Sequence, residues 1–219
     1  MIAISDLIDR AEVLAIRDAL ARAPFANGAL TAGAAASRVK RNDQAQGDDP
    51  EVIAASRRVR LALESHVVVR SLVRPVRWSN LIFSRYAKGQ AYGLHADNAV
   101  MSDVDGWAFR TDVSFTLFLS DPETYRGGAL LISDPAGERT YRPKAGCVVF
   151  YPTGYLHKVT PVTAGERLAC VGWVQSLVQR PDQREILFDL ERLRDGAPGD
   201  TALILDKTIG NLLRMWGQV

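Results

Sequence analysis

The feature that most limits the fold is a run of short apolar segments between residues 78 and 177. These segments are WSNLIFSRY, DVSFTLFLS, GALLIS, RTYRP, GCVVFYP, HKVTPV and RLACVGWVQS. Turn-forming stretches rich in Gly, Pro and Asp separate them, among them DPETYRGG and PKAG. Many short strands at this spacing predict an all-β sandwich or barrel, in place of alternating βαβ units. A jelly roll is one such double-sheet arrangement.

Helical periodicity flanks this region on its N-terminal side. The segment SDLIDRAEVLAIRDALARAP predicts an amphipathic helix with Ser5 as its N-cap and Pro24 as its stop. A second helix begins after Asp49, because Pro50 suits the first position of a helix. The stretch between the two helices is polar and rich in small residues, and its periodicity is too weak to predict more than a short strand.

Two further helices are predicted at the C-terminal end, in QREILFDLERLRDG and TALILDKTIGNLLRMWGQV. The second of them carries an apolar stripe made of Leu203, Leu205, Ile209, Leu212, Leu213 and Trp216. Such a stripe most often packs on its own domain, and a contact between two copies in a homodimer is the second interpretation. We therefore divide the chain into an N-terminal region of helices and a first strand (1–77), a β core (78–177) and a C-terminal helical extension (178–219).

Composition excludes several classes of protein. A chain of 219 residues suits one domain, and a net charge of +2 from evenly spread basic residues does not indicate nucleic-acid binding. No signal peptide is recognisable, and no apolar run is long enough to cross a membrane. Cys147 and Cys170 both lie in apolar strand-like runs, which is typical of reduced core cysteines in a cytoplasmic protein, although a disulfide between them is the alternative.

A possible metal site is formed by His95, Asp97 and His157, which make an H-x-D…H pattern. Residues two apart on a strand point to the same side, so His95 and Asp97 can reach one ion, while His157 comes from another strand after YPTGYL. Two imidazoles and one carboxylate can bind one face of an octahedral ferrous ion and leave the other face open. Zinc accepts the same ligands, so the ligand set alone leaves the metal open. The third histidine, His66, ends the second helix and is interpreted as structural.

A second feature is a cation placed for an anionic co-substrate. Arg167 opens the apolar strand RLACVGW, where its planar fork can bond both oxygens of a carboxylate, such as the far carboxylate of a metal-bound 2-oxoglutarate. The alternative for Arg167 is a solvated strand end beside Glu166. Tyr86 and Tyr92 precede the ligand pair and can donate hydrogen bonds to the co-substrate, Tyr86 ahead of Tyr92, or else fill the core. Trp173 is interpreted as a core residue near the site.

Three blocks of this chain resemble the PKHD-type hydroxylases. They are SRYAKGQAYGLHADNAV, RTDVSFTLFLSDPETYRGGALLI and YPTGYLHKVTPVTAGERLACVGWVQS, and the likeness extends to NLLRMW near the end. The family comprises bacterial iron(II)- and 2-oxoglutarate-dependent dioxygenases related to the prolyl 4-hydroxylase catalytic domain. The resemblance implies a double-stranded β-helix core, iron bound by His95, Asp97 and His157, and 2-oxoglutarate bound by Arg167. It also implies dependence on ascorbate.

The residues leave rival functions open. A sensory module would keep iron and 2-oxoglutarate without hydroxylating anything, and a zinc-dependent hydrolase on a cupin-like barrel would leave Arg167 without a purpose. A purely structural β-sandwich would leave the whole pattern to coincidence. The dioxygenase interpretation requires dioxygen and a primary substrate, either a peptidyl residue or a small molecule, which the sequence does not identify. Trp107 and Phe109 are candidates to line the mouth of the site, or to plug it.

Overall fold

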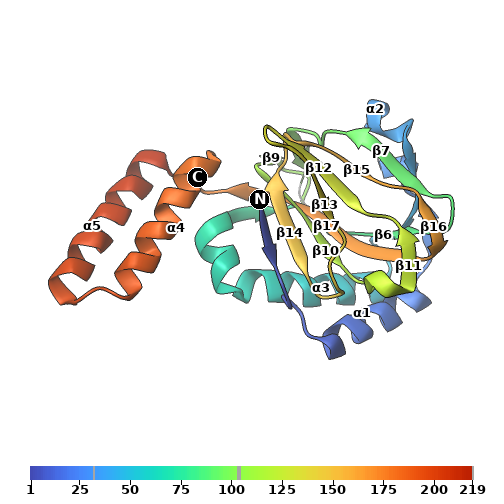
Figure 1. Cartoon of the computed structure of the whole chain (residues 1–219), viewed down its shortest axis with the longest axis horizontal. Coiled ribbons are helices and arrows are strands. Elements are labelled where there is room, and N and C mark those ends of the chain that lie inside the picture. Colours follow the sequence, from blue (N-terminus) through green and yellow to red (C-terminus); the bar gives the residue numbers. More distant parts are fainter. Residues whose placement is uncertain (32, 103–104, 219) are drawn as a thin grey trace.

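The computed structural model describes residues 1–31, 33–102 and 105–218. Two β-sheets face each other, with α-helices below them and a helical hairpin to one side (Figure 1). This is the mainly β architecture with flanking helices that the strand spacing and the helical periodicity together predicted. No helix in the described part of the chain combines the length and the apolar character needed to cross a membrane.

The larger sheet has eight strands, in the order β1-β14-β10-β17-β6-β4-β2, and β5 also pairs with β17. Its strands are β1 (Ile2–Ile4), β2 (Phe25–Asn27), β4 (Asp43–Ala45), β5 (Pro75–Trp78), β6 (Ile82–Tyr86), β10 (Val113–Phe118), β14 (Val148–Pro152) and β17 (Arg167–Ser176). Residues on β17 alternate between the two faces of the sheet, as a strand requires. Leu168, Cys170 and Val174 enter the main hydrophobic core, while Arg167 and Trp173 line a cavity on the opposite face.

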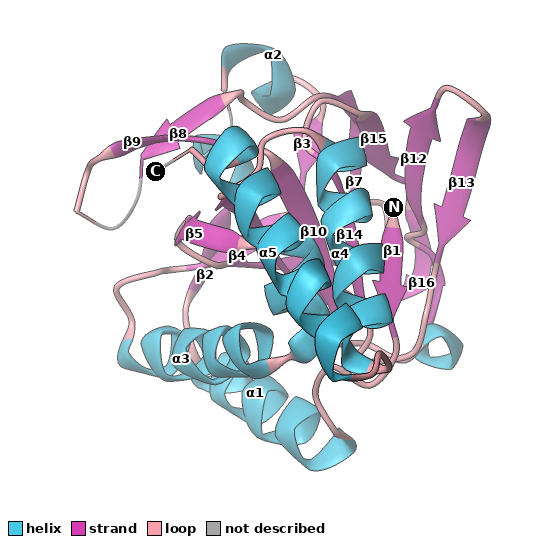
Figure 2. Cartoon of the chain, turned by 90° about the vertical axis from the view of Figure 1, so that its left-hand side faces the viewer, coloured by secondary structure: helices cyan, strands magenta, loops and turns pink. Residues whose placement is uncertain are grey.

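The main hydrophobic core lies between this sheet and two helices, α1 (Arg10–Arg22) and α3 (Pro50–Ser65), which run side by side beneath it (Figure 2). The Asp49 carboxylate accepts a hydrogen bond from the Glu51 N–H and caps α3 at the predicted position. The prediction for the first helix was wrong at its start. Ser5 lies in a turn after β1, and Asp9 is the N-cap, because its carboxylate accepts the Glu12 N–H at 2.8 Å.

The smaller sheet has five strands, in the order β13-β12-β15-β7-β3. They are β3 (Lys40–Arg41), β7 (Ala91–His95), β12 (Leu130–Asp134), β13 (Gly137–Tyr141) and β15 (Leu156–Val159). Two two-stranded sheets complete the fold, β8 (Val100–Ser102) with β9 (Ala108–Arg110) and β11 (Tyr125–Gly127) with β16 (Val162–Gly165). Short helical turns, η1 (Gly28–Thr31), α2 (Ala34–Ser37), η2 (Val69–Val73) and η3 (Pro122–Thr124), connect these strands. The cavity between the two large sheets is lined by both of them.

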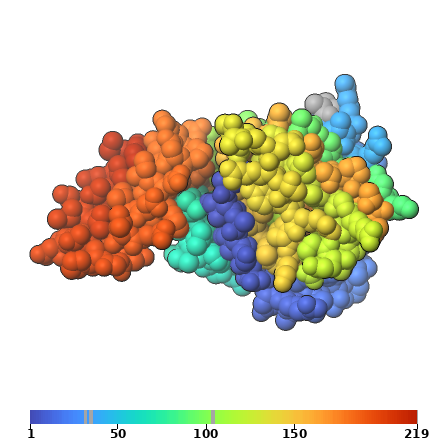
Figure 3. Space-filling view, viewed as in Figure 1, coloured from blue at the N-terminus to red at the C-terminus, as the bar shows by residue number. Residues whose placement is uncertain are grey.

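The chain ends in a helical hairpin, α4 (Pro181–Asp195) and α5 (Gly199–Trp216), that projects from the sheets (Figure 3). Its own small core contains Val178, Leu187 and Ile209, so the predicted stripe does pack within the chain. Leu203 is an exception because it is 69% exposed. An ion pair between Arg74 and Glu191, at 2.9 Å, ties α4 to the body of the protein.

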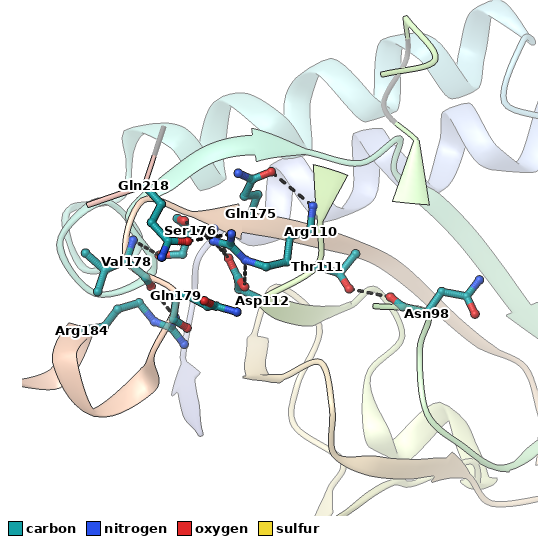
Figure 4. A network of polar contacts seen from close by, with 10 residues as sticks. All are labelled: Asn98, Arg110, Thr111, Asp112, Gln175, Ser176, Val178, Gln179, Arg184 and Gln218. Atoms are coloured by element: carbon teal, nitrogen blue, oxygen red, sulfur yellow. Dashed lines mark hydrogen bonds and ion pairs between the residues drawn. The ribbon is translucent and has the colours of Figure 1, made fainter. Parts of the chain in front are cut away.

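The C-terminal residues return to the sheets, where a polar network fixes them (Figure 4). Arg110 donates two hydrogen bonds to the Asp112 carboxylate, at 2.6 and 2.9 Å, and one to the side chain of Gln218 at 3.0 Å. Asp112 also accepts the N–H of Ser176, and the Gln218 N–H donates to the Leu177 carbonyl. The end of the chain is therefore attached to the start of β10.

Candidate metal and co-substrate site

Strand pairing brings the three predicted ligands together. His95 ends β7 and lies directly opposite His157 on the antiparallel strand β15, while Asp97 follows in the loop after β7. The Nε2 atoms of His95 and His157 lie 3.7 and 3.6 Å from the Asp97 carboxylate oxygens. One ligand atom from each residue lies within 4.8 Å of the other two. The H-x-D…H pattern therefore converges in space.

A backbone carbonyl group fixes the orientation of each imidazole through its Nδ1 atom. His95 Nδ1 lies 2.8 Å from the Gly93 carbonyl oxygen, and His157 Nδ1 lies 3.0 Å from that of Tyr155. A carbonyl oxygen only accepts, so each Nδ1 carries the proton and donates. Each Nε2 is then unprotonated in the neutral ring and carries a lone pair. Backbone carbonyls set histidine ligands in this way in many metal sites.

The protonation state also suits metal binding. Burial, and then the neighbouring His157, lower the pKa of His95 to about 4, so the ring is neutral at physiological pH. Only the neutral imidazole can ligate a metal. Protons do not compete for His95 until the solution is acidic.

The loop that carries Asp97 is held by hydroxyl groups on neighbouring segments. Ser114, on β10, donates to Asp97 Oδ2 at 2.8 Å. Thr111 donates to the Asn98 carbonyl oxygen at 2.5 Å (Figure 4), and its own N–H bonds to the Ala99 carbonyl oxygen. These contacts fix both the carboxylate and the backbone on its C-terminal side.

The donor set fits a divalent metal. Ligand distances of about 2.1 Å place neighbouring ligand atoms roughly 3 Å apart around an ion. The observed separations of 3.6 and 3.7 Å need only a small contraction. Two nitrogens and one carboxylate oxygen with open positions match the ligand set of non-haem ferrous oxygenases. His66 lies elsewhere, at the C-terminal cap of α3.

Arg167 is buried and suited to an anion. It begins β17, is 1% exposed and lines the same cavity as the three ligands. Its guanidinium lies 5.2 Å from the ring centres of both Tyr86 and Phe118. Its Nε and Nη2 have no hydrogen-bond partner among the described residues. Such buried donors are costly unless paired, so the side chain fits the carboxylate of a 2-oxo acid, and the solvated strand end proposed as its alternative is wrong.

The two tyrosines occupy different places in the cavity. Tyr86 pairs with Arg167 across β6 and β17, and burial raises the pKa of its phenol, which keeps it a hydrogen-bond donor. Tyr92 stacks on the His95 ring, with centres 3.6 Å apart and planes 15° apart. Tyr86 therefore lies beside the cation, and Tyr92 lies beside His95.

Several cavity residues were not predicted. Lys40 and Gln44 come from the stretch of weak periodicity and form a side wall, because β3 pairs with β7 and β4 pairs with β6. The Lys40 ammonium lies 5.3 Å from the centre of the Tyr92 ring, and burial lowers its pKa to about 8. Trp173, expected to be core, lines the cavity, and its indole N–H has no hydrogen-bond partner among the described residues.

The two aromatic residues expected at the mouth do not line the cavity as the structure describes it. Trp107 is 68% exposed on the β8–β9 side, and Phe109 is buried on β9. Met101, on β8, lines the cavity.

Comparison with known proteins agrees with this geometry. Residues 81–175 match the model of the 2OG-Fe(II) oxygenase superfamily. A PKHD-type hydroxylase from Rippkaea orientalis is 42% identical over the whole of both chains. One from Maricaulis maris is 46% identical over 93% of this chain and 92% of that protein. The chain belongs to the PKHD-type hydroxylase family. Its likeness to these hydroxylases runs through both the β core and the flanking helices.

Solved structures of more distant proteins share the fold of this PKHD-type hydroxylase family member. A prolyl-4-hydroxylase from Pseudomonas putida is 21% identical, with a TM-score of 0.55 over 80% of this chain and 91% of that one. A prolyl hydroxylase from Trichoplax adhaerens, in complex with a peptide fragment of hypoxia inducible factor, has a TM-score of 0.60 and 16% identity over 85% of this chain and 86% of that one. At these identities the likeness concerns the jelly-roll fold alone.

Proposed function

We propose that this chain is an iron(II)- and 2-oxoglutarate-dependent dioxygenase that hydroxylates a primary substrate. The observation that carries the proposal is one cavity that holds both a His-Asp-His cluster and a buried arginine without hydrogen-bond partners for two of its nitrogens among the described residues. Membership of the family supports the same reaction. A zinc hydrolase would use the cluster but would not need the arginine.

The three predicted ligands share one role in this proposal, which is to bind the metal. His95, Asp97 and His157 would hold the ferrous ion, with the two Nε2 atoms directed by backbone carbonyls. When bound, iron and 2-oxoglutarate supply the oxidising chemistry that couples decarboxylation to succinate and carbon dioxide with oxygen transfer from dioxygen to the substrate.

The co-substrate would be oriented by residues at the other end of the cavity. Arg167 would pair with the far carboxylate of 2-oxoglutarate, and the Tyr86 phenol beside it would add a hydrogen bond. The Phe118 ring on the other side of the guanidinium keeps water away, which strengthens the ion pair. Tyr92, stacked on His95, would keep that ring in place and contact the co-substrate from the metal side.

Further parts of the proposal concern the surroundings of the enzyme. Ascorbate would keep the iron reduced between turnovers, as the family resemblance implies. Two buried free cysteines fit a reducing cytoplasm.

A homodimer through the C-terminal helices is supported by Leu203, Ile204 and Met215 on α5, which are 69%, 58% and 73% exposed. Light scattering of wild type and of Leu203→Glu would test it, because a dimer formed by this face should dissociate in the variant.

The test of the function is coupled turnover. Purified protein supplied with iron(II), dioxygen and 2-oxoglutarate should release succinate, and the correct primary substrate should raise the rate and gain one oxygen atom by mass. Asp97→Ala should abolish succinate release. The proposal is wrong if Asp97→Ala binds iron and releases succinate at the wild-type rate, and a zinc enzyme is indicated if the wild type binds no 2-oxoglutarate.

A further inference from the structure

Asp97 differs from the two histidines in how its position is maintained. His95 and His157 lie within paired strands, whereas Asp97 lies in the loop after β7. A carboxylate on a loop can rotate, and a metal ligand must be held in one orientation to bind well. Some other part of the protein must therefore fix the Asp97 side chain.

Among the described residues, Ser114 donates a hydrogen bond to this carboxylate. Its hydroxyl oxygen lies 2.8 Å from Asp97 Oδ2, and the residue is 1% exposed. It shares its face of β10 with Thr116 and Phe118, and a buried hydroxyl without a hydrogen-bond partner would be costly. Oδ1 lies 3.7 Å from His95 Nε2, and Oδ2 lies 3.6 Å from His157 Nε2. The hydrogen bond to Oδ2 therefore fixes the carboxylate in an orientation in which each oxygen faces one histidine.

A second hydroxyl orients the first. Thr153 follows β14 and is 3% exposed, and its Oγ1 lies 3.1 Å from the Ser114 hydroxyl oxygen. A serine hydroxyl has one proton to donate and lone pairs to accept. Since Ser114 donates its proton to the carboxylate, Thr153 must donate to Ser114. The Thr153 N–H bonds to the Asp112 carbonyl oxygen, which fixes Thr153 to the start of β10.

We propose that Thr153 and Ser114 form a directed pair of hydroxyls that positions Asp97 by holding Oδ2, so that the carboxylate faces both histidines. The inference rests on the proposed function, because it assigns the pair to the same metal site. Ser114 and Thr153 are positioning residues, since both act through the carboxylate. Chains of hydrogen bonds of this kind strengthen one another.

The experiment measures metal affinity by anaerobic titration with iron(II), repeated with manganese(II) as an air-stable probe. Ser114→Ala should weaken binding by about 10-fold to 100-fold, the usual effect of removing a group that orients a ligand. Thr153→Val should weaken binding less, and Ser114→Thr and Thr153→Ser should retain most of the affinity. In the Ser114→Ala background, Thr153→Val should have no further effect on the affinity, because Thr153 acts through Ser114.

The matched control is Ser120→Ala. Ser120 is also 1% exposed, and its hydroxyl accepts the Leu168 N–H at 2.8 Å and a bond from Arg17 at 3.1 Å, so its loss should lower stability. It should leave metal affinity within about twofold of wild type. Urea unfolding of each metal-free variant separates folding defects from binding defects.

Two results overturn the inference. One is Ser114→Ala with wild-type metal affinity, and the other is a Thr153→Val effect that adds in full to that of Ser114→Ala. Either would leave the proposed function intact, because the wild type would still bind iron and 2-oxoglutarate. Failure of the wild type itself to bind metal would instead refute the function and the inference together.

Discussion

His95 and His157 face each other directly across two antiparallel strands, with ring centres 4.2 Å apart. Both direct Nε2 towards the Asp97 carboxylate. The paired strands therefore position both histidines of the proposed metal site, and little rearrangement would be needed on binding. Sites preorganised in this way bind their metals without a large loss of conformational entropy.

Loss of either histidine should remove the metal. His95→Ala and His157→Ala should each weaken iron(II) binding by more than about 100-fold. This loss exceeds the one expected for a residue that only orients a ligand. Anaerobic titration measures this directly. His66→Ala is the matched control, because His66 lies at the end of α3. The iron(II) affinity of this variant should equal that of wild type. Equal effects of all three substitutions would show that the changes act on folding.

Replacing the buried cation should separate co-substrate binding from metal binding. Arg167→Met should raise the dissociation constant of 2-oxoglutarate at least about 30-fold, the loss of a charged hydrogen-bonded pair worth about 2 kcal/mol or more. Iron affinity should not change. Calorimetric titration of the metal-loaded protein reports both quantities. Unchanged 2-oxoglutarate affinity would contradict the role of Arg167.

Although Arg167→Met should weaken 2-oxoglutarate binding, it should raise the free energy of unfolding of the protein without co-substrate. Two nitrogens of the Arg167 guanidinium lack hydrogen-bond partners among the described residues, and replacing a buried charge by an apolar side chain is often stabilising by about 1 kcal/mol or more. Without co-substrate, Arg167→Met should unfold at a higher urea concentration than wild type. Added 2-oxoglutarate should stabilise only the wild type. A variant less stable than wild type under both conditions would indicate a structural role for the charge.

The metal-free protein should lose stability as the pH falls from about 7 towards 4. The pKa of His95 is lowered to about 4 in the folded state, while the unfolded chain has the ordinary value near 6.5. Between these two pKa values the unfolded state binds more protons than the folded state, so a fall in pH favours unfolding. Above the pKa of the unfolded state, His95 contributes no pH dependence to the stability. Urea unfolding across this range should give a shallower pH dependence in His95→Asn. An identical pH dependence in both proteins would rule out this contribution.

The cysteines should be inert in the folded protein. Cys147 and Cys170 are free and buried, and burial raises the pKa of the Cys170 thiol far above its ordinary value. Because the thiolate is the reactive form, a thiol reagent should modify neither residue until urea unfolds the chain. Mass spectrometry before and after unfolding counts the modified residues. Rapid labelling of the native protein, or a disulfide in the purified protein, would contradict the packing.

Much of the site was predictable because histidine, aspartate and arginine side chains stand out within apolar, strand-like segments. The H-x-D pair, a distant histidine and an arginine that opens an apolar strand all converge on one cavity. The helix at Pro50 was predictable because proline and an acidic N-cap act locally. The cap of the first helix was missed because Ile2–Ile4 pair with β14 and the helix begins only after Asp9, which is a long-range effect.

The residues missed were those whose partners lie far away in the sequence. Lys40 and Gln44 reach the cavity only because β3 pairs with β7 and β4 pairs with β6, and the periodicity of their own segment is weak. Ser114 carried a partial signal, because it is one of two hydroxyl residues in the mostly apolar strand VSFTLF, but its contact with Asp97 depends on the loop after β7. Strand pairing between distant segments and the path of the loop after β7 determined these contacts, and no local sequence pattern reveals either of them.

The most direct test of the account is an anaerobic titration of iron(II) followed by 2-oxoglutarate, monitored by visible absorption. The account predicts one iron per chain and a charge-transfer band when the co-substrate is added. The band should be absent in Asp97→Ala and should require far more 2-oxoglutarate in Arg167→Met. Undiminished iron binding in variants lacking His95, Asp97 or His157 would contradict the account.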